Sequence, residues 1–235
     1  MLHTEEPSSI ADAGNTVYDA PSRILVVAGE YNVSGIDRNP VTGQPQEQLL
    51  NVQSVYFYPT YPFKTQEQMI AKIQDTRAIN NDGVALIKLR QPINGQCSAL
   101  ACLPTEFEVG NACAHYEECV ITGWGFSTEN FSDVQDELLL SRVRLSSSEA
   151  CDFLTKRLGL SDFRPRGSAC QSPRNQNTDS CLGDEGGPVL CAWGNHWVVR
   201  GILPFNLCAS GRFNLYVTEI APYLSWIKRT MTSYG

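Results

Sequence analysis

The chain has 235 residues, of which 42% are hydrophobic and 18% charged, so its composition is that of a folded globular protein and not of a disordered one. Its formal net charge of -7 argues against a nucleic-acid partner, because proteins that bind phosphate backbones usually carry a basic face. No run of apolar residues approaches the roughly 20 that are needed to cross a bilayer, so we expect no membrane span.

Short β-rich runs, separated by Gly, Pro, Asn and Asp, follow one another along the chain, and their spacing favours an all-β barrel or sandwich. In chain order they cover residues 24–28, 49–58, 84–89, 119–122, 138–145, 188–193, 197–203 and 214–218. A helical period occurs in two places, residues 66–75 and residues 220–231, where the apolar side chains share one face. The second period predicts a C-terminal helix that packs on the β structure.

Composition also suggests how the chain is divided. Residues 1–23 are rich in Ser, Ala, Asp and Asn and show little period-two alternation, so we expect an irregular N-terminal segment. The polar stretch 107–118 is the expected linker between a first β domain over residues 24–106 and a second over 119–218, followed by the helix over 219–235. The segment after Met1 lacks the apolar region of a signal peptide, so we expect a mature fragment.

Nine cysteines at irregular spacing, with only three histidines, favour an oxidising compartment over a zinc site or a set of reduced thiols. We therefore expect a secreted, extracellular protein. Two Asn-x-Ser triplets, which begin at Asn32 and Asn130, are sequons for N-glycosylation and fit that location.

The segment Cys181-Leu-Gly-Asp-Glu-Gly-Gly-Pro-Val-Leu-Cys191 resembles the nucleophile loop of trypsin-like serine proteases (peptidase S1), which normally reads Cys-x-Gly-Asp-Ser-Gly-Gly-Pro-x-x-Cys. Further segments stand at the family's order and approximate spacing: Val84-Ala-Leu-Ile-Lys-Leu89, Ala101-Cys-Leu-Pro104, Cys119-Val-Ile-Thr-Gly-Trp-Gly125 and Tyr223-Leu-Ser-Trp-Ile227. The resemblance runs from about Ile24 onward. It implies an all-β fold of two antiparallel Greek-key β-barrels with the active site between them and a C-terminal helix, the first barrel lacking its N-terminal strands in this chain.

Amide hydrolysis in this family requires a Ser nucleophile, a His base, an Asp that orients the His, and backbone donors for the oxyanion. Gly183, Gly186 and Gly187 allow the tight turn that aims N–H groups at one point, so Gly183 and Glu185 are the remnant of the oxyanion hole. Glu185, however, stands at the nucleophile position. A carboxylate would have to form a mixed anhydride, and its charge would lie beside the oxyanion, so we expect acyl transfer to be blocked.

The other two catalytic positions are also altered. Gly83 stands where the family has the orienting Asp. A one-residue slip to Asp82 is the alternative, although adjacent residues on a strand point to opposite faces. The histidine upstream is His3, either the remains of the catalytic segment or an exposed terminal histidine. We expect no catalytic role for His115 or His196, and the three histidines form no metal-ligand pattern.

The resemblance also implies a degenerate specificity pocket. Asp179 matches the basal acid that selects Lys or Arg, but Asn206 and Asn214 stand where small glycines normally admit a side chain, so the pocket should be narrowed or filled. Glu30 and Glu47 resemble two acidic positions that some relatives use to hold calcium. Calcium binding stays open, since no denser set of oxygen ligands is visible, and we expect no cofactor or other metal.

The family pattern implies the disulfides Cys119–Cys191, Cys151–Cys170 and Cys181–Cys208. Cys97 and Cys113 are at no familiar family positions, so we expect them to pair with each other. Cys102 then remains, and an odd cysteine in a secreted protein suggests an intermolecular bond or a free thiol. We expect Cys102 to bond a light chain or a preceding region that supplies the missing strands of the first barrel.

These expectations lead to one functional hypothesis and one alternative. The chain is expected to be a noncatalytic serine protease homolog that serves as a secreted binding, regulatory or structural subunit of an extracellular protein complex. Loops around the inactive cleft, with residues 66–75 as the first candidate, would contact further extracellular protein partners. The alternative is an active trypsin-like endopeptidase with noncanonical catalytic residues.

Overall fold

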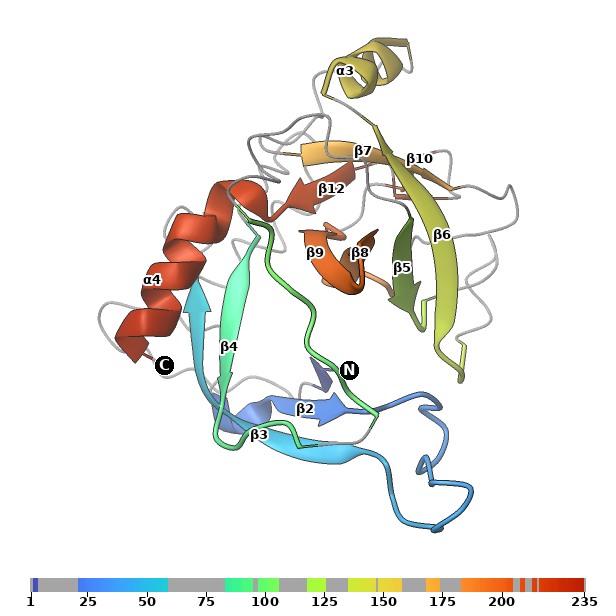
Figure 1. Ribbon diagram of the computed structural model, residues 1–235, viewed down its shortest axis with the longest axis vertical. Coiled ribbons are helices and arrows are strands. Elements are labelled where there is room, and N and C mark those ends of the chain that lie inside the picture. Colours follow the sequence, from blue (N-terminus) through green and yellow to red (C-terminus); the bar gives the residue numbers. More distant parts are fainter. Residues whose placement is uncertain are drawn as a thin grey trace. The chain divides into compact units, whose positions relative to one another are not determined.

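The computed structural model describes residues 2–3, 21–58, 83–94, 97–105, 118–125, 135–146, 148–157, 168–173, 183–204, 208–209, 213–214 and 216–234. The described part is mostly β-strand and ends in a short helix, with a closed barrel and a second sheet (Figure 1). It divides into two compact units: the first holds the described residues up to Ala99 together with those from Ile227 onward, and the second holds Leu100 to Trp226. This arrangement of strands and helix is consistent with the expected double-barrel fold.

The second unit contains a closed, antiparallel barrel with the strand order β12-β7-β6-β5-β8-β9. Its strands are β5 (Cys119–Gly123), β6 (Leu139–Ser146), β7 (Ser168–Pro173), β8 (Pro188–Trp193), β9 (His196–Ile202) and β12 (Tyr216–Glu219). Strand β12 closes the barrel by pairing with β7 on one side and with β9 on the other. Closure gives every barrel strand two neighbours, so no strand edge is left open.

The barrel core follows from the two-residue period of its strands. Alternate residues along β5, β8 and β12 point inward, and their apolar side chains form a buried cluster with neighbours from β6 and the end of β9: Cys119, Ile121, Val143, Val189, Cys191, Leu203 and Val217. Fully burying a Val or Leu side chain stabilises a fold by about 1.5–3 kcal/mol. This cluster therefore supplies much of the free energy that holds the barrel together.

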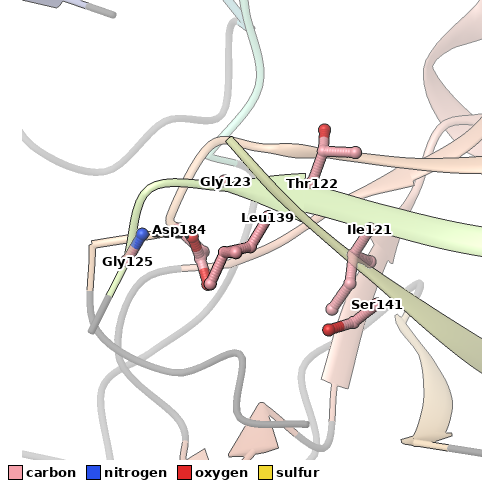
Figure 2. Close-up of a pocket in the computed structure, with 7 residues that line it drawn as sticks. All are labelled: Ile121, Thr122, Gly123, Gly125, Leu139, Ser141 and Asp184. Carbon is pink, nitrogen blue, oxygen red and sulfur yellow. Dashed lines mark hydrogen bonds between the residues drawn. The ribbon is translucent and has the colours of Figure 1, made fainter. Parts of the chain in front are cut away.

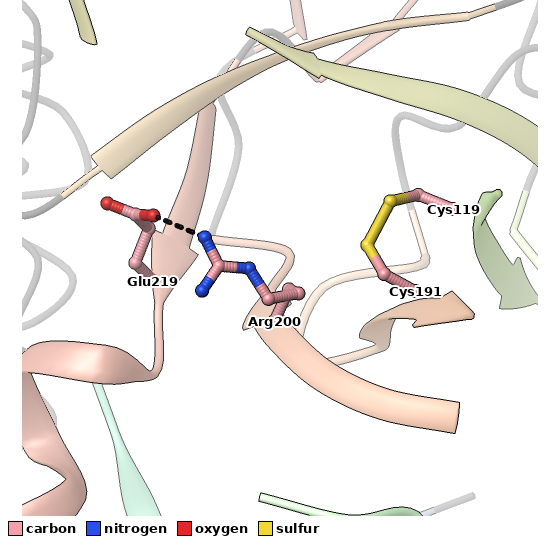
Figure 3. Close-up of a disulfide and its surroundings, with 4 residues drawn as sticks. All are labelled: Cys119, Cys191, Arg200 and Glu219. Atoms are coloured by element: carbon pink, nitrogen blue, oxygen red, sulfur yellow. Dashed lines mark hydrogen bonds and ion pairs between the residues drawn. A yellow bond between two sulfur atoms is a disulfide. The ribbon is translucent and has the colours of Figure 1, made fainter. Parts of the chain in front are cut away.

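Two of the expected disulfides are present in the second unit. Cys119–Cys191 joins directly paired residues of β5 and β8, and Cys151–Cys170 ties helix α3 (Ser148–Arg157) to β7. Both predictions are confirmed. Figure 3 shows the first of these disulfides together with the Arg200–Glu219 ion pair, in which a nitrogen and an oxygen lie 3.4 Å apart and connect β9 to β12. The barrel is thus closed by backbone pairing, by a covalent bond and by a side-chain contact.

The first unit contains an open sheet with the order β1-β2-β3-β4: β1 (Leu2–His3), β2 (Leu25–Ala28), β3 (Gln48–Phe57) and β4 (Ala85–Leu89). Strand β1 modifies the expectation of an irregular segment over residues 1–23, because Leu2 pairs with Val26 and His3 with Leu25. A pair this short depends on backbone hydrogen bonds and leaves no alternating pattern in the sequence. A short 3-10 turn, η1 (Pro21–Arg23), precedes β2.

The boundary between the units falls before Leu100, ahead of the expected linker at 107–118, of which only Glu118 is described. The reason is that the segment around Cys102 lies along β9. The Cys102 backbone N–H donates to the Trp197 carbonyl at 2.8 Å, and the Val199 N–H donates to the Cys102 carbonyl at 2.9 Å. These two hydrogen bonds attach residues 100–105 to the barrel.

The C-terminal helix is confirmed as a 3-10 turn η4 (Ala221–Tyr223) followed by α4 (Leu224–Tyr234). Ile220, Leu224 and Ile227 are buried as the period predicted, whereas Met231 is largely exposed. In the first unit Tyr234 stacks on Tyr56, with ring centroids 4.8 Å apart. No helix among the described residues is long and apolar enough to cross a membrane.

Helix α3, strand β7 and a small hairpin near the C-terminal end were not expected. Helix α3 buries Cys151 and the polar Thr155, so it lacks a clear apolar stripe. Strands β10 (Cys208–Ala209) and β11 (Phe213–Asn214) form a small hairpin in which Cys208 pairs with Asn214. The expected helix over residues 66–75 lies outside the described residues.

Candidate functional site

The candidate site is the tight turn that leads into β8, residues 183–187. Gly183 and Gly186 have φ angles of +92° and +83°, a region that side-chain-bearing residues rarely adopt. The Gly187 N–H donates to the Asp184 carbonyl, and the Gly186 N–H donates to the Leu203 carbonyl, both at 2.9 Å. The glycines therefore fix the turn against the end of β9 and determine where the two acidic side chains between them point.

The Asp184 side chain points into the barrel end. Its Oδ1 accepts the Gly125 N–H at 2.9 Å and lies so close to Gly123 that a Cβ at that glycine would be 1.8 Å away. Burial raises the pKa of Asp184 above its ordinary value, the Gly125 hydrogen bond lowers it, and the neighbouring negative charge of Glu185 raises it. The net upward shift means that this position disfavours an unpaired negative charge.

A small pocket with a volume of about 10 Å³ lies beside Asp184 (Figure 2). Its walls come from β5, β6 and the turn of residues 183–187. Its lining residues are Ile121, Thr122, Gly123, Gly125, Leu139, Ser141 and Asp184. Asp184 is the carboxylate among these lining residues, so it would attract a cationic group that reached the pocket.

The Glu185 side chain does not point into the barrel end as Asp184 does. It folds back along the turn. Its Oε2 accepts the Gly183 N–H at 2.8 Å, a length typical of a hydrogen bond to a charged acceptor. The side chain is half-buried, and its other oxygen, Oε1, is buried without a hydrogen-bond partner. The contact between Glu185 and the Gly183 donor lies within the turn to which the family resemblance assigned an oxyanion-hole remnant, and it was not expected from the sequence.

The structure places the remaining predicted catalytic residues as follows. Gly83 is exposed just before β4, and open space surrounds the position that its Cβ would take. His3 belongs to β1 and His196 is exposed at the start of β9, where it pairs with Trp193. Gly83 and His3 belong to the first unit, whereas Glu185 belongs to the second. Asp82 and His115 lie outside the described residues.

The specificity-pocket prediction is largely outside the described part of the chain. Asp179 and Asn206 both fall there, and Asn214 is described only as a backbone position of β11, opposite Cys208. Cys181, Cys113 and the second sequon at Asn130 are outside it as well. The narrowed pocket and the Cys181–Cys208 disulfide therefore stay predictions.

Two further cysteines, Cys97 and Cys102, lie in the described part of the chain. Cys97 is an exposed thiol whose Cβ lies close to Gly29, 3.7 Å from the position a Cβ would take there. Its expected partner Cys113 lies outside the described residues, so the pair Cys97–Cys113 stays a prediction. Cys102 is exposed as well.

A second group of polar side chains lies in the first unit. Glu30, Asp37 and Glu47 each offer a carboxylate oxygen within 4.8 Å of the others. Burial raises the pKa of Glu30, and the charges of Glu47 and Asp37 raise it further. Carboxylate oxygens are ligands that Ca²⁺ prefers, so these three residues could hold a calcium ion. Sequence reasoning named Glu30 and Glu47 and missed Asp37, which is set in an apparent loop insertion.

Comparison with known proteins gives consistent results. A family model described as Trypsin matches residues 9–227, which begins upstream of the expected start near Ile24. The chain is 28% identical to human "Serine protease 1" over 90% of its own length and 72% of that relative, and 28% identical to "Trypsin-3" of Salmo salar over 90% and 75%. It is 25% identical to "Ovochymase" of Halocynthia roretzi over 95% of this chain and 13% of that protein.

Proposed function

The chain belongs to the trypsin family of serine proteases, and from that premise we propose that it is a noncatalytic member that acts by binding other proteins. The observation that carries the proposal is Glu185, which stands at the nucleophile position with its carboxylate on the Gly183 N–H. A nucleophile in this mechanism must attack a carbonyl carbon and give up its proton to a base. An ionised carboxylate has no proton to give and forms a far poorer acyl intermediate.

Two further substitutions support a loss of catalysis. Gly83 carries no carboxylate to orient a base, and removing that carboxylate alone typically costs on the order of ten-thousand-fold in turnover. The described histidines offer no base in the second unit, apart from exposed His196 at a strand start. Triad members act as a unit, so each defect by itself would be sufficient to remove most activity.

We further propose that the protein is extracellular and joined to another polypeptide through Cys102. Two disulfides within the barrel fit an oxidising compartment. Cys102 is exposed between Leu100, which is 93% exposed, and Leu103, and its backbone pairs with the strand that carries half-exposed Trp197. An interchain disulfide requires an accessible thiol, which Cys102 offers, and the exposed apolar neighbours give a partner chain a surface to pack on. That polypeptide would complete the sheet of the first unit.

N-glycosylation at Asn32 is part of the same proposal. The sequon forms a local turn in which the Ser34 hydroxyl and N–H both donate to the Asn32 Oδ1, at 2.6 and 3.0 Å. Ser34 is exposed, which is where a glycan-bearing segment belongs. The site at Asn130 rests on its sequence alone.

The second candidate, an active endopeptidase with unusual catalytic residues, has support from the intact Gly183-Asp184 turn and from the trypsins among the relatives. One experiment separates the two. The chain is incubated with peptide amides that contain Lys or Arg and with an active-site acylating reagent, together with Glu185→Ser. We expect no hydrolysis and no stoichiometric labelling of either protein. Hydrolysis by the unsubstituted chain would support the second candidate, and stoichiometric labelling of Glu185→Ser alone would show that the other catalytic groups are in place.

A further inference from the structure

We propose that Glu185 is an internal ligand of the oxyanion hole: its carboxylate occupies the donor that Gly183 presents and keeps the carbonyl and carboxylate groups of other molecules out. This inference rests on the proposed function, because it concerns the same turn. It adds that the site has lost more than a nucleophile, because the Gly183 N–H that would bind an anion is already occupied by Glu185.

The side-chain length explains why the contact forms. A serine hydroxyl is one atom from Cβ and leaves a donor two residues upstream open to solvent or ligand. Glutamate adds two further carbons, which is enough for Oε2 to reach the Gly183 nitrogen at 2.8 Å while the backbone keeps its tight turn. The positive φ of Gly183 belongs to that turn, so the donor and its occupant are set by the same short segment.

The two acidic side chains of the turn each take one backbone N–H, Asp184 that of Gly125 and Glu185 that of Gly183. Their bonds to separate donors fix both carboxylates in place. Glu185 also leaves Oε1 buried without a hydrogen-bond partner, a desolvation cost that the bond between Gly183 and Oε2 must help to offset. The observed orientation is therefore one that the Gly183 contact determines.

The consequence concerns which molecules the site accepts. A peptide carbonyl or a product carboxylate that approaches the Gly183 N–H has to displace Glu185 and then lie beside its negative charge. A carboxylate there meets a like charge, and a carbonyl turns the negative end of its dipole toward Glu185, so both contacts are repulsive and select against these ligands. Glu185 thus determines specificity: partners that insert a carbonyl or carboxylate into the turn are excluded, and partners that use the surrounding surface are not.

The test uses the amide of Gly183 in the full ¹⁵N-labelled chain, with acetate as the probe. In Glu185→Ala the Gly183 amide should exchange with solvent roughly tenfold faster than in the unsubstituted chain, since it has lost a charge-assisted hydrogen bond. Acetate should then shift the Gly183 resonance in a saturable way, whereas in the unsubstituted chain it should not. Asp184→Asn is the matched control, because it removes one negative charge from the same turn and keeps the Gly183 contact.

Two results would overturn the proposal: unchanged exchange at Gly183 in Glu185→Ala, or an equal response to acetate in the unsubstituted chain. If Glu185→Ala does not fold, the exchange of the Gly183 amide and its response to acetate are measured in Glu185→Gln instead. Its neutral oxygen should give an intermediate exchange rate and a weaker acetate response, and a rate equal to that of the unsubstituted chain would count against the proposal. Hydrolysis by the unsubstituted chain would refute the proposed function alone, so the two failures are distinguishable.

Discussion

The two units of this chain differ in whether the edges of their β-sheets are paired. In the second unit a closed barrel leaves every strand paired on both sides. In the first unit the described strands form an open sheet, whose core is correspondingly small. Among the described residues its buried apolar side chains are Leu50, Val52, Val84 and Ile227, while Leu49 on β3 is 62% exposed. Among the described residues, the comparison shows a larger buried core in the closed barrel than in the open sheet.

The largest expected effect concerns the covalent closure of the barrel. Replacing Cys119 and Cys191 together by alanine should lower the free energy of unfolding by about 2–5 kcal/mol, because the bond closes a long loop in the unfolded chain. Denaturant unfolding followed by tryptophan fluorescence measures the loss. Cys97→Ala, which removes an exposed thiol from the first unit, is the control and should change little. Equal losses in both proteins would remove the contrast between the units.

Packing density should differ between the units as well. A Cβ on Gly201 would lie 2.1 Å from Val217 Cγ1 and 2.8 Å from the Thr218 carbonyl oxygen, so Gly201→Ala should cost about 1–3 kcal/mol through overpacking in the barrel. Gly83→Ala is the matched change in the first unit, where nothing lies within 4 Å, and it should cost less than about 0.5 kcal/mol. Thermal unfolding of both variants checks this, and a Gly201→Ala protein of unchanged stability would contradict it.

A smaller effect is expected from pH. Because the pKa of Asp184 in the folded chain is raised above its ordinary value of 3.8, the folded state holds this proton more tightly than the unfolded state. The contribution of Asp184 to the free energy of unfolding is therefore lost as pH rises from 3.8 through the raised pKa. Asp184→Asn keeps an acceptor for the Gly125 N–H and removes the charge, so it should raise the melting temperature at neutral pH.

At acid pH, where Asp184 is protonated, that advantage should disappear. Melting curves of the two proteins between pH 3 and 7 provide the measurement. Destabilisation by Asp184→Asn at neutral pH would instead indicate that a cation, such as an amino terminus, already pairs with this carboxylate.

The smallest expected effect lies in the first unit. If Glu30, Asp37 and Glu47 hold calcium, added Ca²⁺ should raise the melting temperature by relieving the repulsion among the three carboxylates. Glu47→Gln should abolish the response, while Glu219→Gln, which removes an acid from the second unit, should leave it intact. An identical calcium response in both variants would exclude these residues as the site.

The sequence was most informative where a single pattern determined the structure. Short β-rich runs predicted β5, β8 and β9, and the nucleophile motif predicted the turn that carries Glu185. Strand β7 was missed because its buried residues, Ser168, Ala169, Cys170 and Gln171, are small or polar and do not alternate. The contact between the Glu185 carboxylate and the Gly183 N–H could not be predicted from the sequence either, since a motif gives the residue at a position but not the direction of its side chain.

The division of the chain has a consequence for the order of synthesis. The first unit includes residues from Ile227 onward, and the barrel of the second closes through β12, so neither unit has all its parts until the C-terminal helix has left the ribosome. Folding domain by domain during translation, the usual route for chains of this size, is therefore unavailable to either unit. A chain shortened to end at Ile202 should leave both units unfolded, and protease resistance of residues 21–58 in that chain would disprove this.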